Sequence, residues 1–204
     1  MSYGHPHDEP RHERSPYAAR VRAMEALLVE KDVLTEAEIQ DRIEYMESRS
    51  PANGAMLVAR AWTDQAFKQR LLSDAKSATR ELGIDPTHEA ELIVVENTPT
   101  VHNLIVCTLC SCYPRAILGR PPDWYKSFAY RSRAVREPRA VMRAFGFEPS
   151  EGVEVAVYDS TADVRYMVLP MRPSGTGSMD EKDLAALVTR DALIGAGVPR
   201  GPRE

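Results

Sequence analysis

The sequence predicts an α+β protein in which a helical N-terminal arm precedes a layered α-β-β-α domain. Apolar residues recur at helical spacing through the first third of the chain, and four short runs rich in β-branched residues follow. Cap residues, glycines and prolines separate these segments. We therefore expect a disordered tail (1–14), a helical arm (15–50) and one main domain (51–204).

Composition limits the class of protein. The chain has 204 residues, of which 43% are hydrophobic and 27% charged, so it can bury a core. Its formal net charge of -4 argues against a nucleic-acid binder, because phosphate binding needs a positive field. No apolar run approaches the roughly 20 residues that span a bilayer, and the polar start does not resemble a signal peptide. We expect a cytoplasmic protein with no membrane contact.

The arm contains two predicted helices. The first begins near Ser15 and Pro16, a serine cap followed by proline in the first turn. The second starts at Thr35, where Thr35 and Glu38 match the capping box. Both helices have narrow apolar stripes and many charges. They are expected to pack on another surface, either the main domain or a partner subunit.

The main domain is expected to begin with a break and more helix. Ser50 to Gly54 has the composition of a turn, and helical segments then cover 55–82, with Thr63 as a cap and Gly83 as a stop. Two apolar, β-branched strands follow, at 91–96 and 102–106.

The second half of the domain is predicted to mix short helices and strands. After a proline-rich loop, helices are expected at 123–130 and 138–145 and strands at 153–158 and 164–169. Ser178 and Glu181 match a second capping box, which would open a helix that runs to about Asp191.

The three cysteines form the candidate site. All lie within Cys107–Cys112, directly after the second predicted strand, whereas a secreted disulfide framework would spread an even number along the chain. Cys110 and Cys112 offer two thiolates, and the backbone nitrogens of Ser111 and Cys112 lie between them. If these amides lose their protons, one six-membered and two five-membered chelate rings make a square N₂S₂ set. Cys107 can add an axial thiolate and leave the sixth position open, as metal catalysis requires.

This donor set favours particular metals. Zinc prefers a tetrahedron, whereas a strong, negatively charged square field suits low-spin Co(III) or Fe(III). Such an ion would acidify a bound water or polarise a bound nitrogen. Exposed thiolates in the plane are open to oxidation to sulfenic and sulfinic acids.

Other interpretations of the cysteines remain open at this point. Cys107 and Cys110 have the spacing of a redox dithiol. A structural zinc site could use the three cysteines together with His102. A plain buried cysteine cluster would have no chemistry at all.

The segment Val106–Tyr113 resembles the metal claw of nitrile hydratase α subunits, and the resemblance extends over residues 17–195. Further matching segments are Ala61–Asp64, Val95–His102, Leu118–Ser127, Tyr130–Arg133, Arg136–Arg139, Arg165–Pro170 and Leu187–Asp191.

The resemblance implies a role for each claw residue. Cys107 would be the axial thiolate, Cys110 the sulfinic acid and Cys112 the sulfenic acid. The backbone nitrogens of Ser111 and Cys112 would complete the plane, and Cys110, Ser111 and Cys112 would form the catalytic group. Thr108 is the residue of cobalt-type members, where iron-type members have serine, so the resemblance favours non-corrin Co(III) over Fe(III).

The resemblance also implies an enzyme and its partners. The activity would be that of a lyase, hydration of a small-molecule nitrile to an amide, with water or the Cys112 sulfenate oxygen as nucleophile. A β-type subunit, as one chain or two, would supply two arginines to the oxidised sulfurs, which need paired cations. An accessory protein would load the metal.

The sequence departs from the family pattern at Arg115, where many nitrile hydratases have a tryptophan in the pocket wall. An arginine here is similar to the thiocyanate hydrolase γ subunit, which implies an alternative activity, hydrolysis of thiocyanate to carbonyl sulfide and ammonia. Arg115 could instead bind a polar, nucleoside-like nitrile, or face solvent without touching substrate. His88 replaces a common glutamine near the metal. A metal-carrying paralogue without turnover is a further alternative.

A run of arginines follows the claw. Its members are Arg131, Arg133, Arg136, Arg139 and Arg143. We interpret them as a solvated helix face paired with acids, or as a subunit interface. The aromatic residues Trp124, Tyr125 and Tyr130 are expected to pack loops or a partner interface.

Overall fold

A computed structural model of the chain describes residues 16–87 and 90–202. The predicted tail (1–14), Ser15 and His88 lie outside the described residues. The described residues form two compact units, the first ending at Ser48 and the second beginning at Arg49.

The first unit contains two helices, α1 (Pro16–Glu30) and α2 (Glu36–Glu47). The predicted capping box of α2 is present, because the Thr35 side chain accepts from the backbone N–H of Glu38 and the Glu38 carboxylate accepts from that of Thr35. The described side chains of α2 include no buried residue. Several apolar residues of this unit are exposed, namely Tyr17, Val21, Met24, Leu27, Val33, Leu34, Ile43 and Met46.

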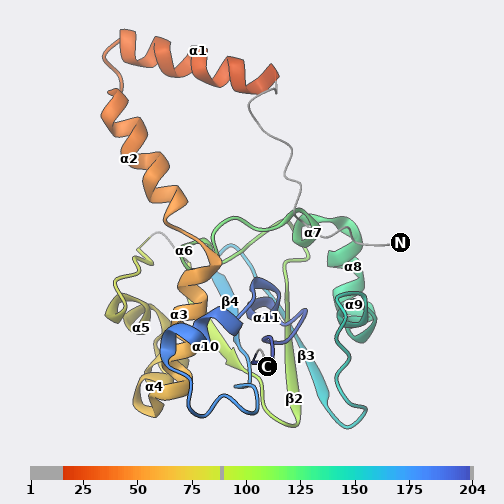
Figure 1. The fold of residues 1–204 in the computed structure, drawn as a ribbon. Helices are drawn as coiled ribbons and strands as arrows, with labels where there is room; N and C mark the ends of the chain where they lie inside the picture. The colour runs from red at the N-terminus through yellow and green to blue at the C-terminus, as the bar shows by residue number, and fades with distance from the viewer. Residues whose placement is uncertain (1–15, 88–89, 203–204) are drawn as a thin grey trace. The chain divides into compact units, whose positions relative to one another are not determined.

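The second unit mixes helices and strands, which confirms the α+β class (Figure 1). Its elements in chain order are α3 (Pro51–Thr63), α4 (Gln65–Ser73), α5 (Ala75–Glu81), β1 (Glu91–Glu96), β2 (Val101–Val106), α6 (Arg115–Leu118), α7 (Asp123–Lys126), α8 (Phe128–Arg136), α9 (Pro138–Ala144), β3 (Glu154–Asp159), β4 (Val164–Leu169), α10 (Glu181–Leu187) and α11 (Arg190–Ile194). The four strands lie within one residue of their predicted bounds.

The strands form two parallel pairs at the centre of this unit (Figure 1). β1 pairs with β4, and β2 pairs with β3. The two pairs contact each other through β2 and β4. Helices α4 and α5 contact β1, while α8 contacts β2 and α9 contacts β3. Helices therefore flank both strand pairs, in the predicted α-β-β-α order.

The break predicted at residues 50–54 is wrong. Ser50 caps α3, which begins at Pro51 and continues through Asn53 and Gly54. Gly54 is a packing residue, because a β-carbon there would lie 2.8 Å from a methyl of Leu193 and 2.9 Å from one of Leu118. The sequence does not distinguish a glycine that ends a helix from one that allows close packing.

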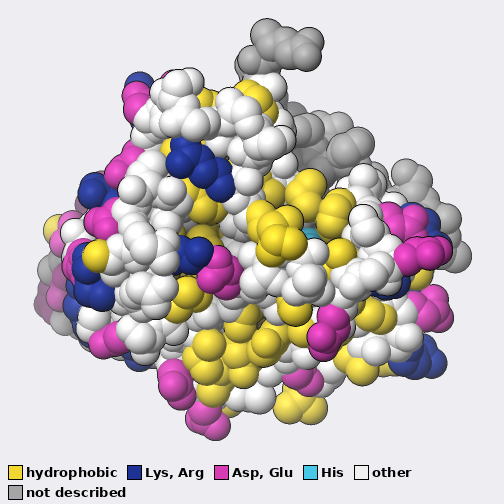
Figure 2. Space-filling model, turned by 90° about the horizontal axis from the view of Figure 1, so that it is seen from below, with side chains coloured by type: hydrophobic (Ala, Val, Ile, Leu, Met, Phe, Trp, Pro, Cys, Tyr) yellow, Lys and Arg dark blue, Asp and Glu magenta, His cyan; other side chains and the backbone are white. Residues whose placement is uncertain are grey.

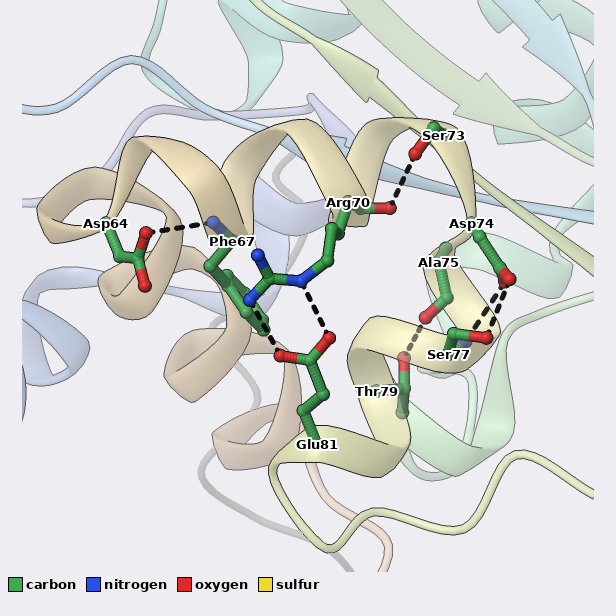
Figure 3. Close-up of polar contacts among 9 residues, drawn as sticks. All are labelled: Asp64, Phe67, Arg70, Ser73, Asp74, Ala75, Ser77, Thr79 and Glu81. Carbon is green, nitrogen blue, oxygen red and sulfur yellow. Dashed lines mark hydrogen bonds and ion pairs between the residues drawn. The ribbon is translucent and has the colours of Figure 1, made fainter.

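The helical stretch predicted at 55–82 consists of three helices, and Thr63 is not the cap. Asp64 caps α4, where its carboxylate accepts from the backbone N–H of Phe67 at 2.9 Å (Figure 3). Asp74 caps α5 in the same way. Arg70 then ties the two helices together with two 2.8 Å hydrogen bonds to the Glu81 carboxylate.

The long C-terminal helix is also wrong. The cap of α10 is Asp180, one residue before the helix, and Ser178 lies outside the cap. The helix ends at Leu187, and α11 begins separately with Thr189 as its cap. The helix predicted at 123–130 is likewise divided into α7 and α8, because Ser127 is extended and caps α8.

The surface seen in Figure 2 mixes charges of both signs with hydrophobic patches. The coloured side chains on this face therefore do not form a continuous basic field of the kind that phosphate binding needs. Among the described residues, the helices are too short or too polar to cross a membrane.

Candidate metal centre

Cys107, Cys110 and Cys112 lie together at the end of β2. Their sulfur atoms all lie within 4.8 Å of one another, with 3.7 Å between Cys107 and Cys110 and 3.4 Å between Cys110 and Cys112. Cys107 is buried, Cys112 is half-buried and Cys110 is exposed. Within residues 16–87 and 90–202, this is the one group of His, Cys, Asp or Glu side chains with metal-binding spacing.

The spacing of the sulfurs fits a shared metal ion. Thiolates bind a metal at about 2.3 Å, so two of them around one ion lie about 3.3 Å apart at right angles and about 4.6 Å apart when opposed. The observed separations of 3.4 and 3.7 Å match neighbouring ligands. The backbone N–H of Cys110 also donates to the Cys107 sulfur at 3.3 Å, which keeps the loop folded back on the strand.

The start of the loop is held by the neighbouring strand. β2 and β3 run in parallel with Val106 opposite Asp159, so the claw begins beside the carboxyl end of β3. The Asp159 carboxylate accepts from the backbone N–H of Thr108 at 2.9 Å and from its hydroxyl at 2.5 Å. The backbone N–H and the hydroxyl of Thr108 are therefore both directed toward the Asp159 carboxylate.

The outer part of the loop is held by helix α8. Nη1 of Arg131 donates to the carbonyl oxygens of Thr108, at 3.2 Å, and Leu109, at 3.0 Å. Its guanidinium also lies over the ring of Phe128, 6.0 Å from the centroid. Leu109 and Phe128 are 82% and 78% exposed, so two large apolar side chains flank the claw.

Two buried tyrosines donate hydrogen bonds to the claw and to the strand before it. The hydroxyl of Tyr125 donates to the carbonyl oxygen of Cys112 at 2.9 Å, and that of Tyr130 donates to Ile105 in β2 at 2.6 Å. Burial raises the pKa of both phenols above the usual range, so both hydroxyls stay neutral donors at neutral pH. Trp124 packs edge-on against both rings.

The three thiols influence one another's protonation. The hydrogen bond from Cys112 and the backbone N–H of Ser111 lower the pKa of the Cys110 thiol. Burial and the hydrogen bond with Cys110 together raise the pKa of Cys112 to about 12, although Arg165 lowers it. Cys110 therefore ionises before Cys112, and a bound metal cation would favour the thiolate form of both.

The structure separates His102 from the claw. Its Nε2 lies 2.8 Å from the carbonyl oxygen of Gly195, and its Nδ1 lies 3.3 Å from the side-chain nitrogen of Asn97. Both ring nitrogens are engaged, and His102 is absent from the group of metal-spaced side chains. The predicted zinc alternative thus lacks its fourth ligand.

Arg115 follows the claw in α6, and its side chain is exposed. Within the described part of the chain, one arginine of the run pairs with an acid and two others bind different partners. Arg139 donates to three backbone carbonyls, Arg136 to the Ser132 hydroxyl, and Arg143 makes an ion pair with Glu148.

The sequence did not identify the residues that hold the loop. Asp159 lies 47 or more residues after the claw and gave no motif, because only the parallel pairing of β2 and β3 brings it to Thr108. Arg131 appeared only as one member of a basic run. The one signal that pointed to Tyr125 and Tyr130 was their place in segments that match the family.

Comparison with known proteins agrees with this site. The profile of the nitrile hydratase α chain matches residues 15–197. The chain is 54% identical over 192 residues to the α subunit of the low-molecular-weight cobalt-containing nitrile hydratase of Rhodococcus rhodochrous, covering 92% of this chain and 91% of that one. It is 39% identical to the thiocyanate hydrolase γ subunit of Thiobacillus thioparus, covering 87% and 78%.

A solved structure shares the fold. An iron-type nitrile hydratase double mutant from Comamonas testosteroni superposes with a TM-score of 0.81 at 43% identity, covering 91% of both chains. The profile match and these identities extend over nearly the whole chain. This chain therefore belongs to the nitrile hydratase α-chain family.

Proposed function

We propose that this chain is the metal-carrying subunit of a nitrile hydratase, which adds water across a C≡N bond to give an amide. The observation that carries the proposal is the position of three sulfur atoms within 4.8 Å of one another at the end of β2, in a chain of this family. The cobalt-containing relatives and Thr108 support non-corrin Co(III) as the metal. When bound, that ion would supply Lewis acidity toward the nitrile and water.

The claw residues take different roles in this proposal. Cys107, which is buried, would hold the ion from the side that the protein covers. Cys110, Cys112 and the backbone nitrogens of Ser111 and Cys112 would be its other ligands. With an external oxidant such as dioxygen, the exposed Cys110 thiol would become the sulfinic acid and the Cys112 thiol the sulfenic acid. Cys110, Ser111 and Cys112 thereby form the catalytic group on the open side of the loop.

A partner subunit completes this site. Leu109 and Phe128 are the most exposed large apolar side chains in the second unit, and both flank the claw. We propose that a β-type partner, as one chain or two, covers them and supplies cations for the oxidised sulfurs. The exposed apolar residues of α1 and α2 support a role for residues 15–50 as an arm on that partner.

Metal loading needs reduced thiols. The three cysteines are free and close enough to oxidise to disulfides. We therefore propose a reducing cytoplasmic location and an accessory protein that delivers the metal.

Arg115 determines the class of substrate in this proposal. It is a charged, exposed donor one turn beyond the claw, where its guanidinium can meet an oxygen or ring nitrogen of a polar nitrile. The same charge favours an anion, and a thiocyanate hydrolase γ subunit is among the relatives. The second candidate is thus the conversion of thiocyanate and two waters to carbonyl sulfide, ammonia and hydroxide.

The test offers both substrate classes to one complex. The chain is co-expressed with its partner genes in cobalt medium, and the product of each substrate is identified by mass. Amide from neutral nitriles, with little turnover of thiocyanate, supports the hydratase. Carbonyl sulfide from thiocyanate, with nitriles inert, supports the second candidate, and a complex that binds cobalt but turns over neither would be the inactive paralogue.

A pair of variants assigns Arg115. Arg115→Met should lower kcat/KM for a polar nitrile about tenfold relative to a simple aliphatic nitrile, the loss expected for one hydrogen bond from a charged donor. Arg120→Met is the control, since Arg120 is another exposed arginine just beyond α6. Equal selectivity in the two variants would make Arg115 a bystander.

A further inference from the structure

We propose that Arg131 is a positioning residue that holds the claw loop open in its ligand-binding shape before the metal arrives. This inference rests on the proposed function, because it assigns a task to the loop that function requires. It begins from the fact that Thr108, Leu109 and Cys110 are exposed and belong to no helix or strand. Ordering a free loop of this kind costs conformational entropy at every residue.

The loop is held on both sides of its backbone. Asp159 accepts the N–H and hydroxyl protons of Thr108, while Arg131 donates to the carbonyls of Thr108 and Leu109. The two groups come from different elements, β3 and α8, so the loop is fixed between them. The next residue is Cys110, whose backbone N–H reaches the Cys107 sulfur. Fixing Thr108 and Leu109 therefore also limits where the Cys110 sulfur can lie.

The helix that carries Arg131 is firmly anchored. Ser127 caps the first turn of α8, and Tyr130, the residue before Arg131, is fully buried. The Tyr130 hydroxyl donates to Ile105, two residues before Cys107. The helix that carries Arg131 is thus fixed to the strand that carries the claw.

The partners of Arg131 are two carbonyl oxygens of the claw loop and the Phe128 ring. Its buried Nε has no hydrogen-bond partner among the described residues. Arg70 and Arg143 bind carboxylates, whereas Arg139 binds backbone carbonyls as Arg131 does. What distinguishes Arg131 is that its carbonyl partners lie in the claw loop. A buried Nε–H without a partner needs an explanation. The position of the guanidinium against the loop carbonyls provides one.

The test compares Arg131→Met with Arg136→Met in the metal-free full-length chain. Both changes remove one arginine of α8, but among the described residues Arg136 donates to Ser132 of the same helix and not to the claw loop. Hydrogen exchange is followed for the amides of residues 108–110. Arg131→Met should raise their exchange rate at least about tenfold, because it removes both hydrogen bonds from this charged group to the loop. Arg136→Met should leave it unchanged.

An internal control separates loop positioning from folding. Exchange in β2 should be the same in both variants. If residues 108–110 exchange at the same rate in Arg131→Met as in Arg136→Met, the proposal is overturned. It is also overturned if Arg131→Met raises the exchange rate of β2 equally, because Arg131 would then stabilise the whole fold. Because this measurement needs no metal, it decides the role of Arg131 even if the wild-type complex fails to bind cobalt and the proposed function fails.

A second readout uses the cobalt-loaded complex. Arg131→Met should lower the cobalt content per chain and shift the sulfur-to-metal absorption band, whereas Arg131→Lys should restore both in part, since lysine keeps the charge but not the planar fork. Cobalt content and absorption equal to wild type in Arg131→Met would contradict the proposal.

Discussion

The two buried tyrosines allow one chemical change to be made in two places. Tyr125→Phe and Tyr130→Phe each remove a single hydroxyl and keep the ring. The first takes a donor from the Cys112 carbonyl in the claw, and the second takes one from the Ile105 carbonyl inside β2. The two hydrogen bonds therefore report separately on the metal site and on the core.

The size of each effect follows from burial at the acceptor. Leaving a buried carbonyl unsatisfied costs about 1 to 3 kcal/mol. Ile105 is 1% exposed, so Tyr130→Phe should lie at about 2 kcal/mol, which lowers Tm by roughly 4 to 8 °C for a domain of this size. Cys112 is half-buried and its carbonyl can turn to water, so Tyr125→Phe should cost about 1 kcal/mol.

At the metal site, Tyr125→Phe should have the larger effect and Tyr130→Phe the smaller one. Tyr125→Phe loosens the carbonyl of an expected ligand residue, so the cobalt-loaded complex should hold less cobalt per chain and show a shifted sulfur-to-metal band. Tyr130→Phe should retain the wild-type cobalt content in the folded fraction. Thermal unfolding by circular dichroism and cobalt content by mass spectrometry check the pair. A larger Tm loss for Tyr125→Phe together with an unchanged metal site would refute the reasoning.

Three further outcomes are expected. Gly195→Ala should lower the free energy of unfolding by more than about 3 kcal/mol and yield little soluble chain. The φ of Gly195 is +80°, and a β-carbon there would lie 1.8 Å from the Asn103 carbonyl oxygen. Normal yield and an unchanged urea midpoint would be inconsistent with this packing. Asp64→Ala should lower the free energy of unfolding by about 1 kcal/mol through the lost cap on Phe67, whereas Asp64→Asn should retain most of it; equal losses would argue against capping. Burial lowers the pKa of His102, so the folded chain binds fewer protons there than the unfolded chain. This contribution is complete above the unfolded pKa of about 6.5 and declines as pH falls through that value, so the urea midpoint should drop from pH 7.5 to 5.5, and His102→Gln should flatten the change.

The sequence was most informative where a local rule decides the structure. The strands were placed from runs of β-branched residues, and α2 from a capping box whose partners lie three residues apart. The claw is a contiguous motif, so its sulfurs were expected to meet, and the structure brings all three within 4.8 Å. Chelate geometry within Cys110–Cys112 depends only on neighbouring atoms.

Tertiary structure decided which distant residues pack against these helices and strands and which of them hold the claw loop. Gly54 has the composition of a turn, yet it lies within α3 because Leu118 and Leu193 pack against its bare face. The carboxylate that receives Thr108 and the arginine that binds the loop carbonyls come from β3 and α8, and their positions depend on parallel pairing and helix packing. Chemistry within a short segment is set by covalent spacing, whereas the support around it depends on contacts between residues far apart in the chain.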